Sequence, residues 1–247
     1  GRRNLIAQSQ SHDARFQQTI VNYQDTVLRA AREVEDAMAG FLRGQEEAGF
    51  LAEAVAAFGC VDYFVANAGI SMWARFEDIE DVAVFRKLME TNYLGVVYGV
   101  HAVLPQLKKT GGVIVAISSI QGKIGVPLHT GYVASKHAVL GFFESLRMEL
   151  DGSGVAVLTV LPHWLRGTGL RENAFGKDGE VLGASSRKHS KESISLEACS
   201  IAILGAMKKR KHELVIPWKL RALPWLNLIH PRIVAWLVKG KVTREDH

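Results

Sequence analysis

The stretch that decides the fold is residues 113–119, VIVAISS, an apolar run that follows two glycines and ends in two serines. Its length and its β-branched residues predict a strand that is buried on both faces of a sheet. Short apolar runs of the same kind occur before and after it, at residues 63–66, 155–160 and 213–217. Segments with apolar residues at helical spacing separate these runs, at residues 82–107, 132–150 and 196–207.

This alternation of strands and helices bounds the fold class. Parallel strands need long crossover connections, and the helices that make these crossovers cover both faces of the sheet. We therefore predict an α/β protein with a doubly wound parallel sheet. The chain of 247 residues, of which 48% are hydrophobic and 22% charged, is long enough for one large domain with a small appendage.

The first 47 residues follow a different pattern. Residues 12–47 contain no proline, and apolar or small residues recur at alternating spacings of four and three from Phe16 to Phe41. This spacing predicts one long, coiled-coil-like helix that packs on another helix. We place a helical N-terminal segment at residues 1–47 and the α/β domain at residues 48–247.

Cysteine content and charge exclude several classes of protein. Cys60 and Cys199 are too few for a disulfide framework, and neither lies in a metal-binding motif, so we expect no metal site. The net charge is +5, with much of the excess in the run 208–212. Such a run most often marks a solvated helix end, with a nucleic-acid or membrane-surface contact as the alternative. We expect no nucleic-acid partner.

Tyr132 and Lys136 are candidate catalytic residues. They lie four positions apart in the predicted helix 132–150, so both project from one face. A phenol has a pKa of about 10, and a nearby ammonium favours the phenolate and lowers that pKa. Such a tyrosine can exchange a proton with an alcohol or a carbonyl. Taken alone, a pair at this spacing is more often structural.

Two further polar residues favour the catalytic interpretation. Ser119 follows a buried strand, at the end where parallel sheets present side chains to ligands, so its hydroxyl could hold a substrate oxygen for Tyr132. Asn92 lies within an otherwise apolar helix, and a buried amide must be hydrogen-bonded. We expect the helix to be distorted at Asn92 around a bound water.

These residues together resemble the ordered motifs of the short-chain dehydrogenase/reductase (SDR) family of oxidoreductases, which have a Rossmann-like fold. The motifs are residues 67–69 (NAG) after a strand, Asn92, Ser119 and residues 132–136 (YVASK), and the resemblance extends from about residue 51 to at least residue 170. It implies that Ser119, Tyr132 and Lys136 form the catalytic set and that Asn92 holds a proton-relay water. It also implies an NAD(P) cofactor, with NAD versus NADP undetermined, bound by Asn67, Ala68, Gly69, Ile117, Ser118, Tyr132, Lys136 and Pro162.

The chain departs from the family pattern after the third predicted strand. His163 follows Pro162 where the family has glycine, and Gly167 stands where a threonine is expected to hold the nicotinamide carboxamide. Thr168 lies one place later. His163 is either a packing residue or a residue on the substrate side.

A larger departure lies before Asn67. Dinucleotide sites of this family need a first strand that runs into a glycine-rich turn at a helix N-terminus, and the 66 residues before Asn67 contain no such turn. Residues 4–45 instead resemble a fragment of the TolC-like outer-membrane efflux family, so we interpret the chain as a fusion. Without a first strand, residues 63–66 become an exposed apolar edge. We predict that the N-terminal helix covers this edge or that the chain forms homo-oligomers.

The C-terminal quarter allows several interpretations. Residues 166–191 are polar and glycine-containing, and correspond by resemblance to a flap over the substrate, or are a plain surface loop. Residues 218–247 combine aromatic and aliphatic residues with lysine and arginine, which suits a membrane interface, a dimer surface or a cover over the substrate site. No apolar run approaches the roughly 20 residues of a transmembrane helix, and the first residues do not resemble a signal peptide. We expect a cytoplasmic protein, with peripheral membrane contact as an alternative.

The function expected from the sequence is hydride transfer between NAD(P) and a hydroxyl or carbonyl compound, with Tyr132 as acid/base. The apolar tail suits an apolar compound. The alternative is a non-catalytic SDR-fold remnant that acts as a binding or interaction module, because the glycine-rich cofactor loop is missing. A helical adaptor related to efflux channels is a third, weaker hypothesis.

Overall fold

The computed structural model describes residues 49, 51, 53, 55–183 and 193–245, with side chains described as far as residue 240. Contacts within the chain divide it into two units, Gly1–Phe50 and Leu51–His247. The second unit carries the fold described below. The predicted helix at residues 12–47 lies outside the described residues, so its covering of the sheet edge stays a prediction.

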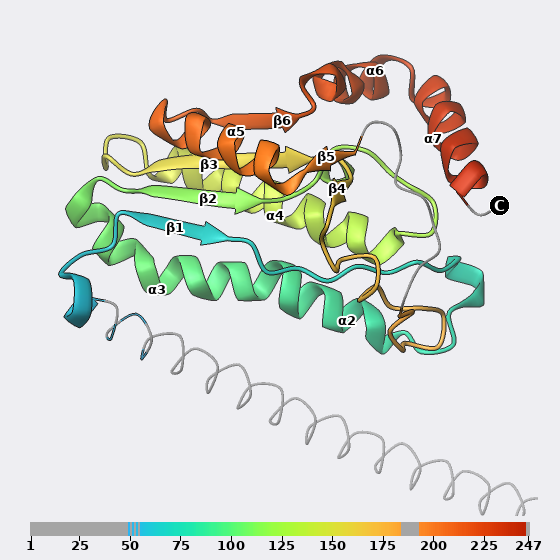
Figure 1. The fold of residues 1–247 in the computed structure, drawn as a ribbon, viewed down its shortest axis with the longest axis horizontal. Coiled ribbons are helices and arrows are strands. Elements are labelled where there is room, and N and C mark those ends of the chain that lie inside the picture. Colours follow the sequence, from blue (N-terminus) through green and yellow to red (C-terminus); the bar gives the residue numbers. More distant parts are fainter. Residues whose placement is uncertain (1–48, 50, 52, 54, 184–192, 246–247) are drawn as a thin grey trace, which may run out of the picture. The chain divides into compact units, whose positions relative to one another are not determined.

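A four-stranded parallel sheet forms the centre of the second unit (Figure 1). Its strands are β1 (Tyr63–Ala66), β2 (Val113–Ile117), β3 (Ala156–Pro162) and β6 (Glu213–Ile216), in the spatial order β1-β2-β3-β6. All three pairings are parallel, and Ala66, Ala116 and Thr159 lie in one register across the first three strands. The four predicted strands and the α/β fold class are confirmed.

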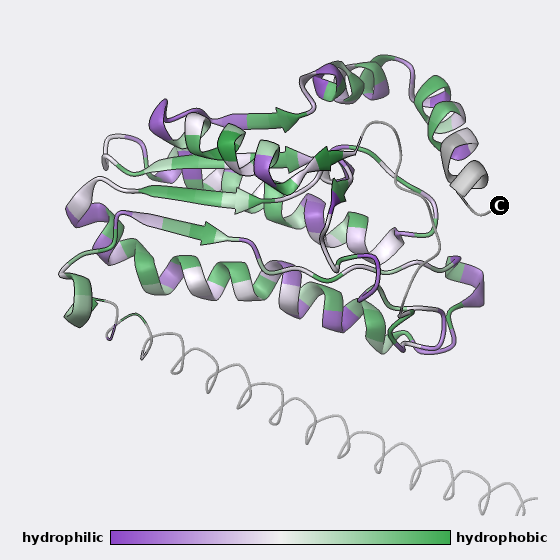
Figure 2. Cartoon of the chain, in the orientation of Figure 1, coloured by the Kyte–Doolittle hydropathy of each residue, from purple (hydrophilic) through white to green (hydrophobic). Residues whose placement is uncertain are grey.

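Helices cover both faces of this sheet (Figure 1). The helices α3 (Gly95–Thr110) and α4 (Thr130–Glu149) lie on one face, and α5 (Leu196–Lys208) lies on the other. Alternate strand residues supply the two cores, as the period of two requires. Ile114 and Val157 pack with Phe143 of α4, whereas Val115 and Leu158 pack toward α5. Figure 2 shows the strands as hydrophobic along most of their length.

The long helix predicted at residues 82–107 is present but interrupted. It consists of α2 (Ala83–Met89), the π-helical turn η2 (Glu90–Leu94) and α3. A π-helical turn inserts one residue into the helical ladder and is frequent at functional sites. The distortion predicted at Asn92 is therefore observed, because Asn92 lies inside this turn.

The strand β1 differs from our expectation of a buried strand. Tyr63 is 61% exposed and Val65 is 49% exposed, and only Ala66 is buried. The physical reason is its position at the end of the sheet, where the described residues provide no strand on its outer side. The described part of the chain therefore leaves the apolar edge that we predicted in the absence of a first strand.

The basic run at residues 208–212 is not wholly solvated. Arg210 donates hydrogen bonds from its guanidinium to the carbonyl oxygens of Gly111, at 3.0 Å, and of Gly154. Gly111 precedes β2 and Gly154 precedes β3. One arginine of the run therefore ties together the amino ends of two central strands.

Shorter elements complete the unit. The 3₁₀ turns η1 (Phe76–Asp78) and η3 (Ile120–Gly122) lie in loops, and the strands β4 (Leu165–Arg166) and β5 (Ile194–Ser195) form a small parallel pair. The tail consists of η4 (Trp218–Ala222), α6 (Leu223–Ile229) and α7 (Pro231–Glu245). Among the described residues, no helix has both the length and the apolar character needed to cross a membrane.

Candidate active site

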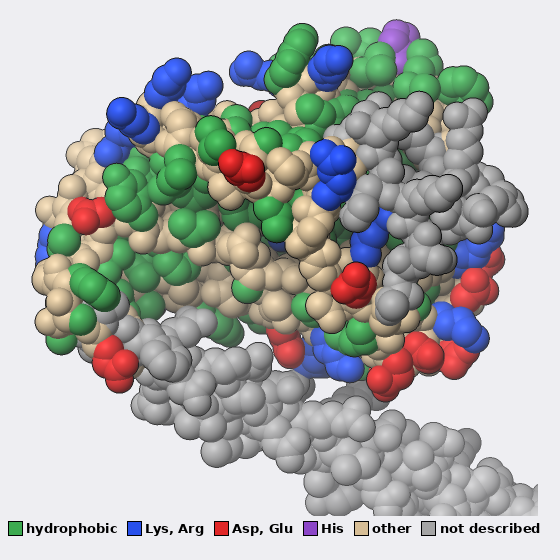
Figure 3. All heavy atoms as spheres, viewed as in Figure 1, with side chains coloured by type: hydrophobic (Ala, Val, Ile, Leu, Met, Phe, Trp, Pro, Cys, Tyr) green, Lys and Arg blue, Asp and Glu red, His purple; other side chains and the backbone are tan. Residues whose placement is uncertain are grey.

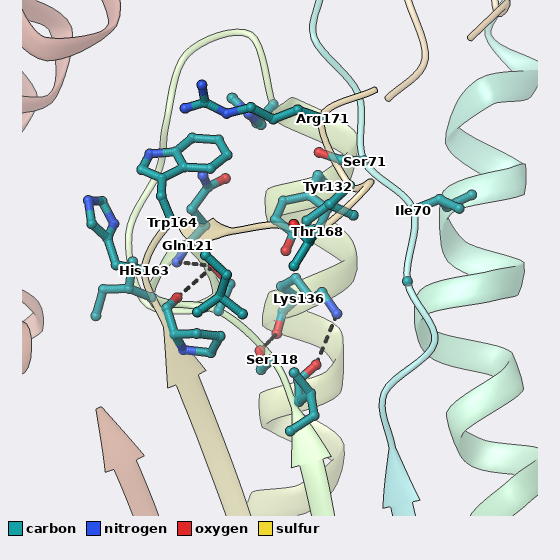
Figure 4. A pocket seen from close by; sticks show the side chains of 18 of the residues that line it. Ile70, Ser71, Ser118, Gln121, Tyr132, Lys136, His163, Trp164, Thr168 and Arg171 are labelled. Carbon is teal, nitrogen blue, oxygen red and sulfur yellow. Dashed lines mark hydrogen bonds between the residues drawn. The ribbon is translucent and has the colours of Figure 1, made fainter. Parts of the chain in front are cut away.

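A cavity of about 470 Å³ opens at the carboxyl ends of the central strands (Figure 4). This is where parallel α/β sheets place ligands, and the volume is in the usual range of small-molecule sites. Its walls come from the loops after β1, β2 and β3 and from the first two turns of α4. The predicted site residues that line it are Asn67, Gly69, Ile117, Ser118, Ser119, Tyr132, Lys136 and Pro162.

Tyr132 projects from the first turn of α4 and is only 6% exposed. Burial raises the pKa of its phenol to about 12, partly offset by a hydrogen bond with the Ser119 hydroxyl. We expected the Lys136 ammonium to lower this pKa, but the net shift is upward, because removal of the phenolate from water is the larger effect. The phenol is protonated at neutral pH.

Lys136 is buried beside the tyrosine on the next turn of α4. Its ammonium lies 5.6 Å from the centroid of the Tyr132 ring and donates a hydrogen bond of 3.1 Å to the carbonyl of Ile117. Burial lowers the pKa of Lys136 to about 8. The ammonium is thus a cation held at the end of β2 with few solvent contacts.

Ser119 connects the elements that meet at the cavity. It follows β2 in extended conformation, and its hydroxyl accepts a hydrogen bond of 3.2 Å from the backbone N–H of Gln121, which starts η3 around the site. A long contact of 3.5 Å joins the same hydroxyl to the carbonyl of Pro162 at the end of β3. The position predicted from the end of the strand is therefore the position that brings Ser119 to Tyr132.

Asn92 does not line the cavity but supports it from behind. The side chain is fully buried. Its amide oxygen accepts from the N–H of Ile70 at 2.8 Å, and its amide nitrogen donates to the Ile70 carbonyl and to the Ser135 hydroxyl, both at 2.9 Å. These three bonds fasten the loop after β1 to α4, next to Lys136.

Two of the three residues of the predicted motif at residues 67–69 lie at the cavity in the structure. Asn67 and Gly69 line the cavity, whereas Ala68 is exposed and is not among the lining residues. Gly69 lies close to Lys136 and Asn92, because a Cβ built on it would lie 3.4 Å from the Lys136 ammonium and 3.4 Å from the Asn92 amide oxygen. The segment in which the chain departs from the family pattern also contributes to the cavity, because His163 and Thr168 both line it.

Sequence reasoning missed four residues that form the outer wall of the cavity, namely Gln121, His129, Trp164 and Arg171. The His129 ring packs 5.8 Å from the Trp164 ring, and the Arg171 guanidinium lies 4.3 Å over the same indole (Figure 4). The Gln121 side-chain oxygen is buried without a hydrogen-bond partner among the described residues. These residues lie outside the regular helices and strands, so no sequence periodicity indicates which of their side chains face a cavity.

The family model for the short chain dehydrogenases matches residues 9–178 of the chain. This match covers more than half of the sequence and includes every motif that lines the cavity. The chain belongs to the short-chain dehydrogenase family. The match also includes residues 9–47, which the sequence pattern had set apart, and the resemblance of residues 4–45 to efflux proteins is not shown by these comparisons.

Two named proteins illustrate the similarity of this chain to other members of the family. The rat protein "Dehydrogenase/reductase SDR family member 7B" is 35% identical over 195 residues, which are 78% of this chain and 59% of that protein. The Arabidopsis thaliana protein "11-beta-hydroxysteroid dehydrogenase-like 4A" is 35% identical over 188 residues, which are 75% of this chain and 60% of that protein. The chain therefore spans about three fifths of the length of these two relatives.

Solved structures of the family share the fold. A short chain dehydrogenase from Burkholderia cenocepacia, solved in complex with NADP, aligns with a TM-score of 0.62 at 22% identity. The alignment covers 77% of this chain and 74% of that one. At this identity the likeness supports the α/β architecture alone.

Proposed function

We propose that the protein is an NAD(P)-dependent oxidoreductase that interconverts a carbonyl group and an alcohol, with Tyr132 as the acid/base. The observation that carries the proposal is the assembly of Ser119, Tyr132 and Lys136 on one wall of a cavity at the carboxyl end of the sheet. Three side chains from a strand end and one helix face meet there, in a buried environment where each hydrogen bond is strengthened.

The residues around this wall fit the nicotinamide half of the cofactor. Gly69 has no side chain and so leaves room for close approach, whereas a Cβ there would be in van der Waals contact with Lys136, 3.4 Å from its ammonium. Lys136, Ile117, Ser118 and Pro162 border the same space, with Asn67 toward β1. When bound, NAD(P) supplies or accepts the hydride. Family structures with NADP support this cofactor class and leave the choice between NAD and NADP open.

The protonation states favour carbonyl reduction. Because the pKa of Tyr132 is raised to about 12, the phenol carries its proton at neutral pH and can donate it to a substrate oxygen. The Ser119 hydroxyl orients that oxygen, and the Lys136 ammonium stabilises the phenolate that remains.

The outer wall indicates a substrate with a flat or apolar body. Trp164 and His129 offer ring surfaces, and the buried oxygen of Gln121 would accept a hydrogen bond from a substrate hydroxyl or amide. The relative named for 11-beta-hydroxysteroids is compatible with such a substrate class.

A second candidate function is a non-catalytic binding module. It is favoured by the exposed edge of β1, where the described residues offer no phosphate-binding turn for the second half of a dinucleotide. We further propose that the chain self-associates at this edge unless residues 12–47 cover it. A compact monomer in size-exclusion chromatography, with residues 12–47 open to protease, would contradict both arrangements.

Fluorescence titration with NADPH and NADH separates the two functions. Saturable binding, followed by NADPH consumption with a panel of apolar ketones, is the expected result. Tyr132→Phe should keep the binding and lose the consumption, because it removes the proton and leaves the ring. Absence of binding at millimolar cofactor would overturn the catalytic proposal and favour the binding module.

A further inference from the structure

The tail of the second unit presents two matching apolar stripes to the outside. On α6 these are Trp225, Leu228 and Ile229, which are 68%, 76% and 67% exposed. On α7 the residues Ile233, Trp236 and Leu237 repeat the same spacing of three and one and are also exposed. Residues three and four apart share one side of a helix, so each stripe is continuous. With Trp218 of η4, at 75%, they make the tail patch.

The patch is not needed to hold the tail on the body of the protein. Other residues do this: Leu220 and Leu223 pack on the core cluster that contains Ile120 and Leu161, and Val234 on α7 is 2% exposed. The helices α6 and α7 therefore use their inner residues for packing and keep the stripes free. Ile120 also lines the cavity, which places the root of the tail behind the wall of the active site.

Basic residues outnumber acidic ones in the tail. Residues 218–247 contain six lysines and arginines, and their acidic residues are Glu245 and Asp246 at the end. Lys219, Arg221 and Arg232 are exposed and alternate along the chain with the residues of the patch. In Figure 3, hydrophobic side chains interrupted by Lys and Arg gather over the region where Figure 1 draws α6.

We propose that the tail patch binds the surface of an anionic lipid bilayer, in the plane of the headgroups. Exposed tryptophans favour the interface between water and acyl chains, and cations near an anionic leaflet add attraction. A second protein surface would need acidic groups to match the exposed cations Lys219, Arg221 and Arg232, whereas a phosphatidylserine-containing leaflet supplies anionic groups everywhere. The proposal concerns binding alone and holds whether or not the active site turns over.

The test is co-sedimentation of the full chain with vesicles of phosphatidylcholine, with and without phosphatidylserine. We expect binding to the mixed vesicles that weakens as salt is added, and little binding to phosphatidylcholine alone. Replacing Trp218, Trp225 and Trp236 together by alanine should weaken binding by at least about ten-fold, since these rings are the largest apolar side chains of the patch and favour the membrane interface. The matched control Ile201→Ala with Leu204→Ala removes equally exposed residues of α5 and should bind as the wild type does.

Charge reversal tests the electrostatic half of the proposal. Each of Lys219→Glu, Arg221→Glu and Arg232→Glu should weaken binding by about five-fold or more, as expected for one cation near an anionic surface. Lys108→Glu with Lys109→Glu is the control, because it lowers the net charge at the far end of α3. Equal losses in patch and control variants would overturn the proposal.

Two further results keep the proposal open to refutation if a variant folds poorly. In the unmodified chain, vesicles with brominated acyl chains should quench tryptophan emission, and absence of quenching overturns the proposal. If light scattering shows a dimer that the tryptophan variant dissociates while vesicle binding is unchanged, the patch binds a second copy and the proposal is wrong.

Discussion

The strands β1 and β2 are parallel neighbours in unbroken register, yet their surroundings are opposite. Residues 113–116 of β2 are all buried, whereas Tyr63 and Val65 of β1 are about half exposed or more. Both strands are apolar, so sequence composition does not explain the difference. The cause is the number of neighbours, because β2 has a strand on each side and helices on both faces.

The difference in burial between β1 and β2 corresponds to a difference between the two sides of the candidate site. The β2 side, with α4 and the end of β3, brings the Ser119, Tyr132 and Lys136 side chains to the cavity. The β1 side contributes Asn67 and Gly69, and Ala68 of the same motif is exposed. The candidate site is therefore most enclosed where the sheet is most buried. Under the proposed function, cofactor binding beside the edge strand β1 depends on what covers that edge.

The largest expected effect is on turnover, and it compares Tyr132 on the β2 side of the site with Tyr63 on β1. Tyr132→Phe should lower turnover by about 10²- to 10⁴-fold, the usual contribution of a general acid. Tyr63→Phe on β1 makes the same chemical change and should leave turnover unchanged, because this residue lies outside the cavity. Steady-state NADPH oxidation measures both, and an equal loss in the two variants would contradict the assignment.

Asn92 links the loop after β1 to α4, and its removal is expected to have the next largest effect, on the free energy of unfolding. Asn92→Ala removes three hydrogen bonds and leaves the Ile70 backbone and Ser135 without them, so unfolding should become easier by about 3 kcal/mol. Urea unfolding measures this loss. Asn227→Ala on α6 is the control and should change little; a loss below about 1 kcal/mol for Asn92→Ala would mean that solvent replaces the bonds.

A pair of valines tests the burial difference directly. Val115→Ala in β2 should cost about 2 kcal/mol of stability, because the side chain is fully buried and a cavity remains. Val65→Ala in β1 should cost no more than about 0.5 kcal/mol if the edge is exposed in solution. Similar losses at both positions would show that something covers β1, either residues 12–47 or another copy.

The smallest expected effect is a dependence of stability on pH. The pKa of Lys136 is lowered to about 8 in the folded protein, so between that value and the ordinary pKa of lysine the unfolded chain binds more protons. Stability must therefore rise with pH in this window and fall as the pH drops through about 8. From about pH 7.5 to about pH 9 the gain is roughly 1 kcal/mol.

The comparison of wild type with Lys136→Met isolates this gain, since methionine has no proton to lose. Urea unfolding at both pH values measures it. Tyr132 adds little, because its raised pKa of about 12 matters only where the unfolded phenol ionises. A pH dependence that is the same in both proteins would contradict the lowered pKa of Lys136.

Much of the fold could be predicted from local sequence pattern. The four strands are short apolar runs and the helices have clear periodicity, so their positions agree with the structure within a few residues. Asn92 was found because an amide in an apolar helix needs partners, and the structure provides three.

Other properties could not be predicted because they depend on distant residues. The exposure of β1 depends on which strands pair with it. The pKa of Tyr132 depends on how far burial outweighs the hydrogen bond with Ser119, and the sequence alone suggested the opposite direction. His129, Trp164 and Arg171 come to the cavity from irregular loops whose paths only the folded chain reveals.

The arginine that joins the amino ends of β2 and β3 has a mechanical consequence. Arg210 bonds to backbone carbonyls at the end of the sheet that lies opposite the cavity. A planar guanidinium presents five N–H donors in a fixed fork and can therefore bond several backbone carbonyls at once. The amino ends of β2 and β3 are thus held together by Arg210, whereas the cavity opens at their carboxyl ends. We expect the motions that admit a ligand to be largest at the carboxyl ends of the strands.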